Sequence, residues 1–287
     1  MMDHIKKFGE RFGKELASDK DCPVCGEPLF YWKNKNSHGR ERITAPVCSK
    51  CGYEDMTRRN SGQIVERAKE TKRNESINWM KNHSVITDTH AWNYTFLGFK
   101  VVDEETRIAK QKAMFWVKQI LKGENVHALL TGSPGVGKSH LSFALVNEVM
   151  KSSQYQKKCA VVSYRELLEQ MKYALNDPEA YKALQGSIIR GLKKADLVVI
   201  DDLGAELGLI DNPVKPTPYN LDTLTSLLEA RLHKATIFTS NLTSSQLLNL
   251  YGERIYSRIL NGAVTTEEPI NAFRFKTTTD KRKYPIK

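Results

Sequence analysis

One stretch, GSPGVGKS at residues 132–139, constrains the fold of this chain more than any other. It has the pattern G-x-x-x-x-G-K-S and lies between a short apolar run, HALLT, and a segment with apolar residues at helical spacing. Glycines let successive backbone N–H groups turn toward phosphate oxygens, and a helix that starts near Lys138 adds its positive dipole end. The pattern therefore predicts a strand, a phosphate-binding loop and a helix, in that order.

The loop predicts a site for ATP. Lys138 would reach the β- and γ-phosphates, and the Ser139 hydroxyl would ligate Mg²⁺. A glycine-rich turn that binds nothing is the alternative, but the apolar run before it and the helical pattern after it favour the phosphate site. The residues expected to line the nucleotide are Gly132, Ser133, Pro134, Gly135, Val136, Gly137, Lys138, Ser139 and His140.

Strands and helices alternate in the pattern from about residue 84 onward. Short apolar runs, typical of buried strands, lie at 127–131, 159–163, 195–202 and 236–241. Between them, apolar residues recur at the spacing of one helical face. Ser163 with Glu166, and Thr243 with Gln246, have the spacing of helix caps. The alternation predicts an α/β domain with a parallel sheet, helices on both faces, and a ligand site at the carboxyl ends of the strands.

Polar side chains stand where two of these strands would end. Asp201 would bind the magnesium, through water, and Asp202 would polarise the water that attacks the γ-phosphate. Asn241 would donate a hydrogen bond to the γ-phosphate or to that water. Each has a structural alternative: the carboxylates as an acidic strand end or a helix cap, and Asn241 as the cap of the helix near Thr243.

Two arginines in YGERIYSRIL are four residues apart and would share one helical face. Arg254 and Arg258 could form a salt-bridged surface. They could instead reach a γ-phosphate held by a neighbouring subunit and stabilise the charge of the transition state, which requires an oligomer. The spacing alone leaves both interpretations open.

Four of the five cysteines form two Cys-x-x-Cys pairs, CPVCG and CSKCG. Cys22, Cys25, Cys48 and Cys51 offer four thiolates, which suits a closed, tetrahedral, structural Zn²⁺ site. The alternative is a redox-active dithiol, but the sequence around these pairs lacks the βαβ pattern in which such dithiols occur. His38 is expected to be a surface residue, and Cys159, in an apolar run, a small buried hydrophobe.

The composition predicts a cytoplasmic protein that can contact polyanions. The 287 residues carry a formal net charge of +11, with 40% hydrophobic and 27% charged residues. A basic surface assists binding of nucleic acid without sequence specificity, and it is also common on proteins without that function. The chain has no apolar run of membrane-spanning length and no secretory signal.

Four segments in this order, GSPGVGKSHLSFAL, ADLVVIDDLGAE, TIFTSNLT and YGERIYSRIL, resemble the AAA+ ATPases of the DnaC/DnaI helicase-loader group and the similar IstB transposition helpers. The resemblance spans about residues 90–275 and implies a five-stranded parallel AAA+ core. It implies that Asp–Asp is usual at positions 201 and 202. In the box GERxxxR, residues 252–258, Arg258 matches the arginine that acts on a neighbouring subunit's nucleotide, and Arg254 matches the first arginine of the box.

The resemblance also implies a further arginine that senses nucleotide within the same subunit. Arg274 is the candidate, although its surroundings depart from the family pattern. Residues 207–220, with three prolines, look inserted and would form a surface loop or face a channel or partner.

We expect three parts: a zinc-ribbon-like domain at 1–58, a helical or partly disordered linker at 59–83, and the ATPase domain at 84–287. Tyr31, Trp32 and nearby basic residues of the first part would contact nucleic acid or dock a protein. By resemblance to the DnaI layout, that part docks on a hexameric replicative helicase. The leading hypothesis is thus an ATP-dependent loader that places the helicase on single-stranded DNA and self-associates through its ATPase domain. The alternatives are an IstB-like transposition helper and a zinc-ribbon nucleic-acid-binding regulator with a nucleotide switch.

Overall fold

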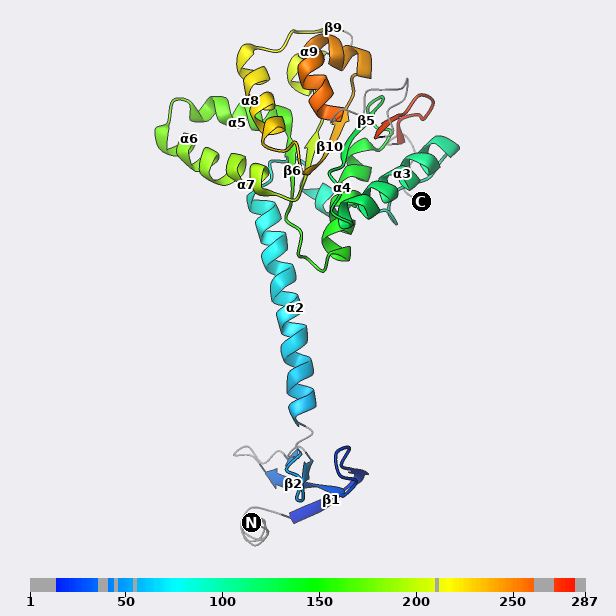
Figure 1. Ribbon diagram of the computed structural model, residues 1–287, viewed down its shortest axis with the longest axis vertical. Helices are drawn as coiled ribbons and strands as arrows, with labels where there is room; N and C mark the ends of the chain where they lie inside the picture. The colour runs from blue at the N-terminus through cyan, green and yellow to red at the C-terminus, as the bar shows by residue number, and fades with distance from the viewer. Residues whose placement is uncertain are drawn as a thin grey trace. The chain divides into compact units, whose positions relative to one another are not determined.

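The computed structural model describes residues 14–35, 41–43, 46–53, 56–209, 212–260 and 271–281. The chain divides into two units, residues 1–71 and 72–287, coloured from blue to red along the chain in Figure 1. His38 lies outside the described residues, and the predicted three-part division stays a prediction. None of the described helices is long and apolar enough to cross a membrane.

The first unit contains a small antiparallel sheet. Strand β2 pairs with β1, β3 and β4. Its described core consists of Cys22, Leu29 and Cys48, with Cys25 and Tyr53 packed against it. Such a core is too small to stabilise a domain by burial alone, so a further cross-link is needed. The strands are β1 (Lys14–Asp21), β2 (Pro28–Lys35), β3 (Glu41–Ile43) and β4 (Val47–Cys48).

Helix α2 (Met56–Asn82) occupies the predicted linker. Residues 64–75 are exposed, as the sparse apolar positions in this segment suggest, and the helix gains buried contacts only near its end, at Met80. The chain then adds a short parallel bridge from Val85 to Val162. The helical interpretation of this segment is therefore confirmed.

Five parallel strands form the sheet of the second unit, in the order β11-β5-β10-β7-β6 (Figure 1). Every neighbouring pair is parallel, so the predicted α/β fold with a five-stranded parallel sheet is confirmed. The strands are β5 (His127–Thr131), β6 (Cys159–Ser163), β7 (Leu197–Asp201), β10 (Ala235–Ser240) and β11 (Ala272–Arg274).

Helices cover both faces of this sheet because successive strand residues point to opposite sides. In β7, Leu197 and Val199 join one buried cluster, whereas Val198 and Ile200 join the other. The first cluster includes α3 and α4, and the second includes α5, α7, α8 and α9 (Figure 1). The helices are α3 (Glu104–Leu121), α4 (Lys138–Ser152), α5 (Tyr164–Ala174), α6 (Pro178–Leu184), α7 (Arg190–Lys194), α8 (Pro218–Glu229) and α9 (Ser244–Leu260).

Of the two helix caps predicted from the sequence, one is confirmed and one is wrong. Thr243 and Gln246 exchange the expected cap hydrogen bonds at the start of α9. The other cap was wrong, because the Ser163 side chain makes no cap hydrogen bond to α5. Cys159 is buried as expected, and burial raises the pKa of its thiol. The proline-rich segment after Leu207 contains the short antiparallel pair β8 (Gly208–Leu209) and β9 (Asn212–Pro213).

Candidate functional site

The phosphate loop lies between β5 and α4, as the sequence predicts. Gly137 precedes α4 with φ +101°, a left-handed conformation that favours glycine. A Cβ atom at this position would lie 2.8 Å from the Phe99 ring, so a larger residue would also clash. The loop lines a cavity of about 770 Å³. The residues that line it are Tyr94, Gly98, Phe99, Lys100, Pro134, Gly135, Gly137, Lys138, Ser139, His140, Asp202, Asn241 and Lys281.

Not every residue of the loop faces this cavity. Gly132 and Ser133 present their carbonyl oxygens to the Lys138 ammonium at 2.8 and 2.9 Å. The Val136 side chain is buried in the core that includes α3 and α4. Of the residues predicted to line the nucleotide, residues 134, 135 and 137–140 line the cavity. Gly132, Ser133 and Val136 instead support the loop from behind.

Lys138, Asn241 and Asp202 are joined at the carboxyl edge of the sheet. The Lys138 ammonium donates to Asn241 Oδ1 at 2.7 Å, and Asn241 Nδ2 donates to Asp202 Oδ1 at 2.8 Å. Asp202 has φ +59°, a conformation that aspartate tolerates better than most residues. The amide of Asn241 thus bridges the Lys138 ammonium at the start of α4 and the Asp202 carboxylate that follows β7.

Asp201, the last residue of β7, does not line the cavity, and its carboxyl group is largely desolvated. Its Oδ1 accepts a 2.6 Å hydrogen bond from the Thr239 hydroxyl, which in turn accepts the backbone N–H of Asp202 at 2.8 Å. Desolvation raises the pKa of Asp201 to about 6, and hydrogen bonds from Thr239 and Ser139 oppose that rise. A serine hydroxyl beside a carboxylate is an oxygen donor set of the kind that Mg²⁺ takes. The residues therefore fit the predicted magnesium site.

The sequence analysis predicted that His140 lines the cavity, but it missed Tyr94 and Phe99, which line the cavity next to it. The His140 ring stacks on Tyr94 with centroids 4.4 Å apart, and its Nε2 lies 3.0 Å from the Thr95 carbonyl oxygen. Burial lowers the pKa of His140, which favours a neutral ring. Phe99 adds an edge-on contact to the same imidazole. The only signal in the sequence was the aromatic and glycine content of YTFLGFK, residues 94–100, which come before α3 and β5 in the chain.

The three arginines do not line the cavity. Arg254 and Arg258, on α9, both pair with the Glu229 carboxylate, at 3.1 and 3.2 Å. Arg274 ends β11 opposite Thr131 and its side chain is exposed. The structure thus brings Lys138, Ser139, Asp201, Asp202 and Asn241 together and leaves the arginines elsewhere on the same unit.

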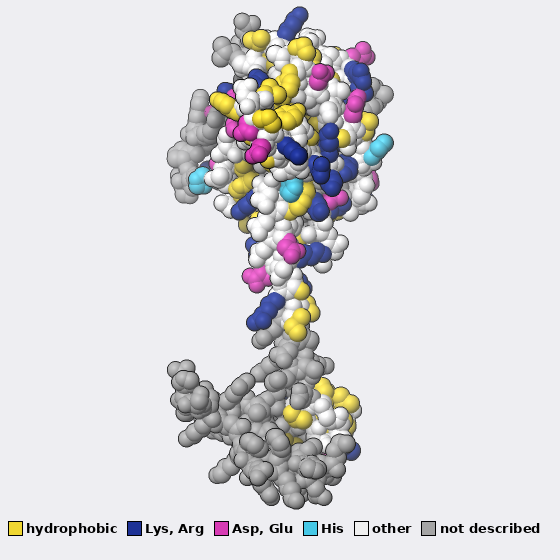
Figure 2. All heavy atoms as spheres, turned by 90° about the vertical axis from the view of Figure 1, so that its left-hand side faces the viewer, with side chains coloured by type: hydrophobic (Ala, Val, Ile, Leu, Met, Phe, Trp, Pro, Cys, Tyr) yellow, Lys and Arg dark blue, Asp and Glu magenta, His cyan; other side chains and the backbone are white. Residues whose placement is uncertain are grey.

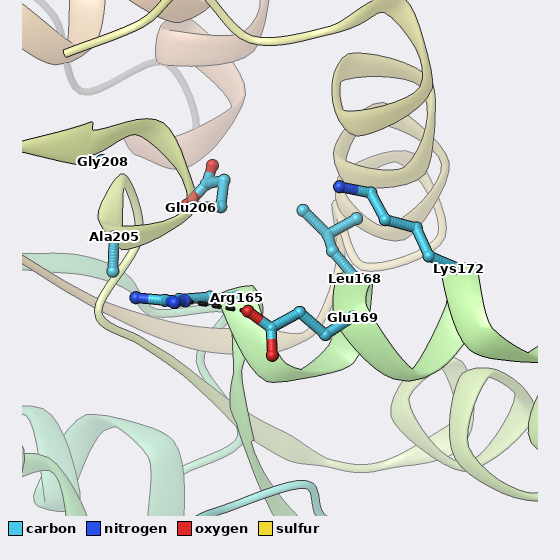
Figure 3. A pocket seen from close by; sticks show the side chains of 7 residues that line it. All are labelled: Arg165, Leu168, Glu169, Lys172, Ala205, Glu206 and Gly208. Atoms are coloured by element: carbon cyan, nitrogen blue, oxygen red, sulfur yellow. Dashed lines mark hydrogen bonds and ion pairs between the residues drawn. The ribbon is translucent and has the colours of Figure 1, made fainter.

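A second, smaller cavity lies between α5 and the turn that follows Asp202 (Figure 3). Arg165 and Glu169, one turn apart on α5, form an ion pair at 3.0 Å on one side of it. The Glu206 side chain borders it from the opposite side, and its Oε2 accepts the Gly204 N–H at 2.9 Å. Glu206 ends the segment ADLVVIDDLGAE that carries part of the family resemblance, and its contact with Gly204 fixes the turn that follows Asp202.

The four paired cysteines come together in the first unit. Their sulfur atoms all lie within 4.8 Å of one another, with Cys22–Cys51 and Cys25–Cys48 at 3.5 and 3.4 Å. Four sulfurs bound tetrahedrally to zinc at about 2.3 Å would be about 3.8 Å apart. Gly26 and Gly52 each donate a backbone hydrogen bond to the first cysteine of their pair. The set is therefore compatible with Zn²⁺, and the cross-link that the small core requires is available.

Comparison with known proteins agrees with this geometry. A family model described as IstB-like ATP-binding protein matches residues 58–264. The uncharacterised protein YdaV of Escherichia coli K12 is 24% identical over 221 residues, which cover 77% of this chain and 83% of YdaV. The replicative helicase loader DnaC of the same strain is 24% identical over 183 residues, covering 63% of this chain and 68% of DnaC. A crystal structure of the DnaC helicase loader matches with a TM-score of 0.52 and 18% identity, over 66% of this chain and 100% of that chain, so the two share a fold.

Proposed function

The chain belongs to the family of IstB-like ATP-binding proteins, with an AAA+ core related to helicase loaders, and from this premise we propose that it is an ATP-dependent loader of a replicative DNA helicase. The observation that carries the proposal is a cluster of four cysteines ahead of an AAA+ nucleotide site within one chain. The cluster gives the chain a second structured module, which a bare ATPase domain would lack.

The nucleotide site supports ATP hydrolysis by positioning and charge. Lys138 would bind the β- and γ-phosphates, while Ser139 and Asp201 would hold magnesium, which neutralises charge on the phosphates. Asp202 would orient the attacking water, since its carboxylate lines the cavity and is held by Asn241 at 2.8 Å. Because the same amide also contacts Lys138, Asn241 would report the state of the γ-phosphate to the base.

Arg254 and Arg258 would act on the nucleotide of a neighbouring subunit. Neither lines the cavity of its own chain, and Glu229 holds both on the surface of α9. An arginine that stabilises phosphoryl-transfer charge must reach the γ-phosphate, so a role for these residues requires self-association. Glu229 would keep them oriented in the free subunit.

Single-stranded DNA would bind to the ATPase domain through its basic surface. Figure 2, which views the side of Figure 1 where α5, α6 and α7 lie, shows several Lys and Arg side chains close together. The exposed basic residues that these helices carry are Arg165, Lys172, Lys182, Arg190 and Lys194. Phosphate contacts of this kind supply affinity without sequence preference, while the cysteine-containing unit would dock on the helicase.

An IstB-like transposition helper is the second candidate, and the description of the matching family model favours it. Such a protein would engage duplex DNA and a transposase. A zinc-ribbon regulator with nucleotide as a switch is a third, and it would bind ATP without turnover.

The test uses the full chain and the hexameric replicative helicase of the same source. Helicase retained on circular single-stranded DNA is measured with ATP, with ADP, and with the Lys138→Ala variant. We expect ATP-dependent loading that the variant loses. Turnover stimulated by duplex DNA, with no helicase complex, would favour the transposition helper instead. ATP binding without hydrolysis would favour the regulator.

A further inference from the structure

The last described segment, residues 275–281, crosses the phosphate loop, and we call it the strap. Its first residue, Phe275, donates its N–H to the Thr131 carbonyl at 2.8 Å, and its last, Lys281, donates its N–H to the Gly135 carbonyl at 3.1 Å. A Cβ atom on Gly135 would lie 1.9 Å from an Asp280 oxygen, so the two segments are in contact. The strap is thus attached to the loop at both ends.

One carboxylate holds the middle of the strap. Glu105, in the first turn of α3, accepts the backbone N–H groups of Lys276, Thr277 and Thr278, the last at 2.8 Å. It also accepts both threonine hydroxyls, at 3.3 and 2.6 Å. Burial acts to raise the pKa of Glu105, but hydrogen bonds from Thr278 and its neighbours outweigh it and lower the pKa. A carboxylate with this many donors fixes three consecutive residues.

The strap ends with an ammonium group in the nucleotide cavity. Lys281 lines the cavity, and its Nζ lies 3.6 Å from the centroid of the Phe99 ring. Its hydrogen bond goes to the Lys100 carbonyl at 2.7 Å. A Cβ atom on Gly137 would be 3.4 Å from this Nζ, which places the cation at the start of α4.

The local chemistry leaves this cation suited to an anion. Within the described ranges Lys281 forms no ion pair, and its contacts are a carbonyl and a ring face. Desolvation lowers its pKa to about 8, and the nearby Asp103 only partly offsets that effect. A half-buried ammonium next to a phosphate loop gains most from a ligand with several negative charges.

We propose that Lys281 binds the phosphates of the nucleotide held by its own chain, and that Glu105 is the positioning residue that delivers it through the strap. The proposal rests on the ATP site of the proposed function, and it assigns to Lys281 the role that the resemblance suggested for Arg274. Arg274 ends the strand before the strap with its side chain exposed, whereas Lys281 lines the cavity directly.

Equilibrium binding of fluorescent ATP and ADP analogues to the full chain tests the proposal. We expect Lys281→Met to weaken ATP binding at least 10-fold, and Lys281→Arg to restore most of the loss. Lys276→Met is the matched control, because this lysine lies in the strap, is exposed and does not line the cavity. Glu105→Ala should weaken binding in the wild-type background but add little to Lys281→Met, since it acts through that lysine.

Two results would overturn the proposal. Unchanged or tighter binding by Lys281→Met would mean that the lysine is idle or competes with the nucleotide for the Phe99 face. A loss with Arg274→Met and none with Lys281→Met would return the role to Arg274. The Lys138→Ala variant separates these outcomes from failure of the proposed ATP site itself. If the wild-type protein binds ATP and Lys138→Ala does not, the ATP site is correct, whatever the result with Lys281→Met.

Discussion

The Tyr251 hydroxyl donates a hydrogen bond to the Glu206 carboxylate, joining residues 45 positions apart in the sequence. Glu206 belongs to the turn after Asp202, and Tyr251 precedes a break in α9 at Gly252, where φ is +80°. Beyond that break lie Arg254 and Arg258. The bond therefore links the end of the strand that carries the catalytic candidates to the helix that carries the arginines.

Removal of the hydroxyl should destabilise this link. We predict that Tyr251→Phe lowers the free energy of unfolding by about 1–2 kcal/mol, because the Glu206 carboxylate loses a donor in a mostly buried place. Urea denaturation measures the change. Tyr256→Phe is the control, since its hydroxyl has no hydrogen bond among the described residues, and it should cost less than about 0.5 kcal/mol. Equal losses for both variants would contradict the prediction.

Asp202→Asn should separate binding from hydrolysis. The asparagine keeps an oxygen that can accept from Asn241 but loses the charge needed to orient and polarise water. We predict a fall in steady-state ATP turnover of at least about 100-fold with ATP affinity retained within a few fold. The control is Asp222→Asn, an exposed carboxylate on α8. Full turnover by Asp202→Asn would remove this residue from the proposed mechanism.

The arginine assignment predicts complementation between inactive subunits. Lys138→Ala and Arg258→Ala should each abolish most turnover alone. Mixed in equal amounts they should regain activity at about a quarter of the interfaces, because one subunit supplies an intact phosphate loop and its neighbour an intact arginine. Turnover is measured against total protein concentration. No recovery in mixtures that demonstrably co-assemble would argue that Arg258 acts within its own chain or only stabilises α9.

The cysteine cluster predicts one zinc per chain. Elemental analysis of the purified protein should find one equivalent, and Cys48→Ser should lower it to well below one because three thiolates hold zinc poorly. Cys159→Ala should keep the full equivalent, since Cys159 is buried away from the cluster in the other unit. A full equivalent of zinc in Cys48→Ser would place the metal elsewhere.

Nucleotide affinity should depend on pH through Lys281. Its pKa is lowered to about 8, so the free protein loses this charge as the pH rises through 8, and ATP binding should weaken between pH 7.5 and 9. Other titratable groups near it are Lys100, Lys138 and Asp202, which line the same cavity, and Asp103 and His140. Lowered pKa values place the titrations of Asp103 and His140 below this range. Lys281→Arg should flatten the profile, because arginine stays protonated. An identical profile for both proteins would assign the titration to another group.

The sequence predicted the parts of this molecule that depend on local chemistry. A phosphate loop needs its glycines and lysine at a fixed spacing, and the two cysteines of a Cys-x-x-Cys pair are close together in the sequence. Both patterns could therefore be recognised from the sequence directly. The sheet followed from apolar runs whose alternate residues face two layers of helices. What was missed came from chain segments remote in sequence: Tyr94 and Phe99 from before the sheet and Lys281 from after it carry no motif. Their positions depend on tertiary contacts, such as the hydrogen bonds by which Glu105 holds the strap.

The order of strands has a consequence for how this protein is made. Strand β5, which carries the phosphate loop, has β11 as its outer neighbour, and β11 is the last strand of the sheet to be synthesised. Until residues 272–274 have left the ribosome, one side of β5 is an unpaired strand edge, which is a template for aggregation. A stop codon upstream of β11 would therefore release a chain whose nucleotide site is unfinished and whose strand β5, next to that site, has one unpaired edge.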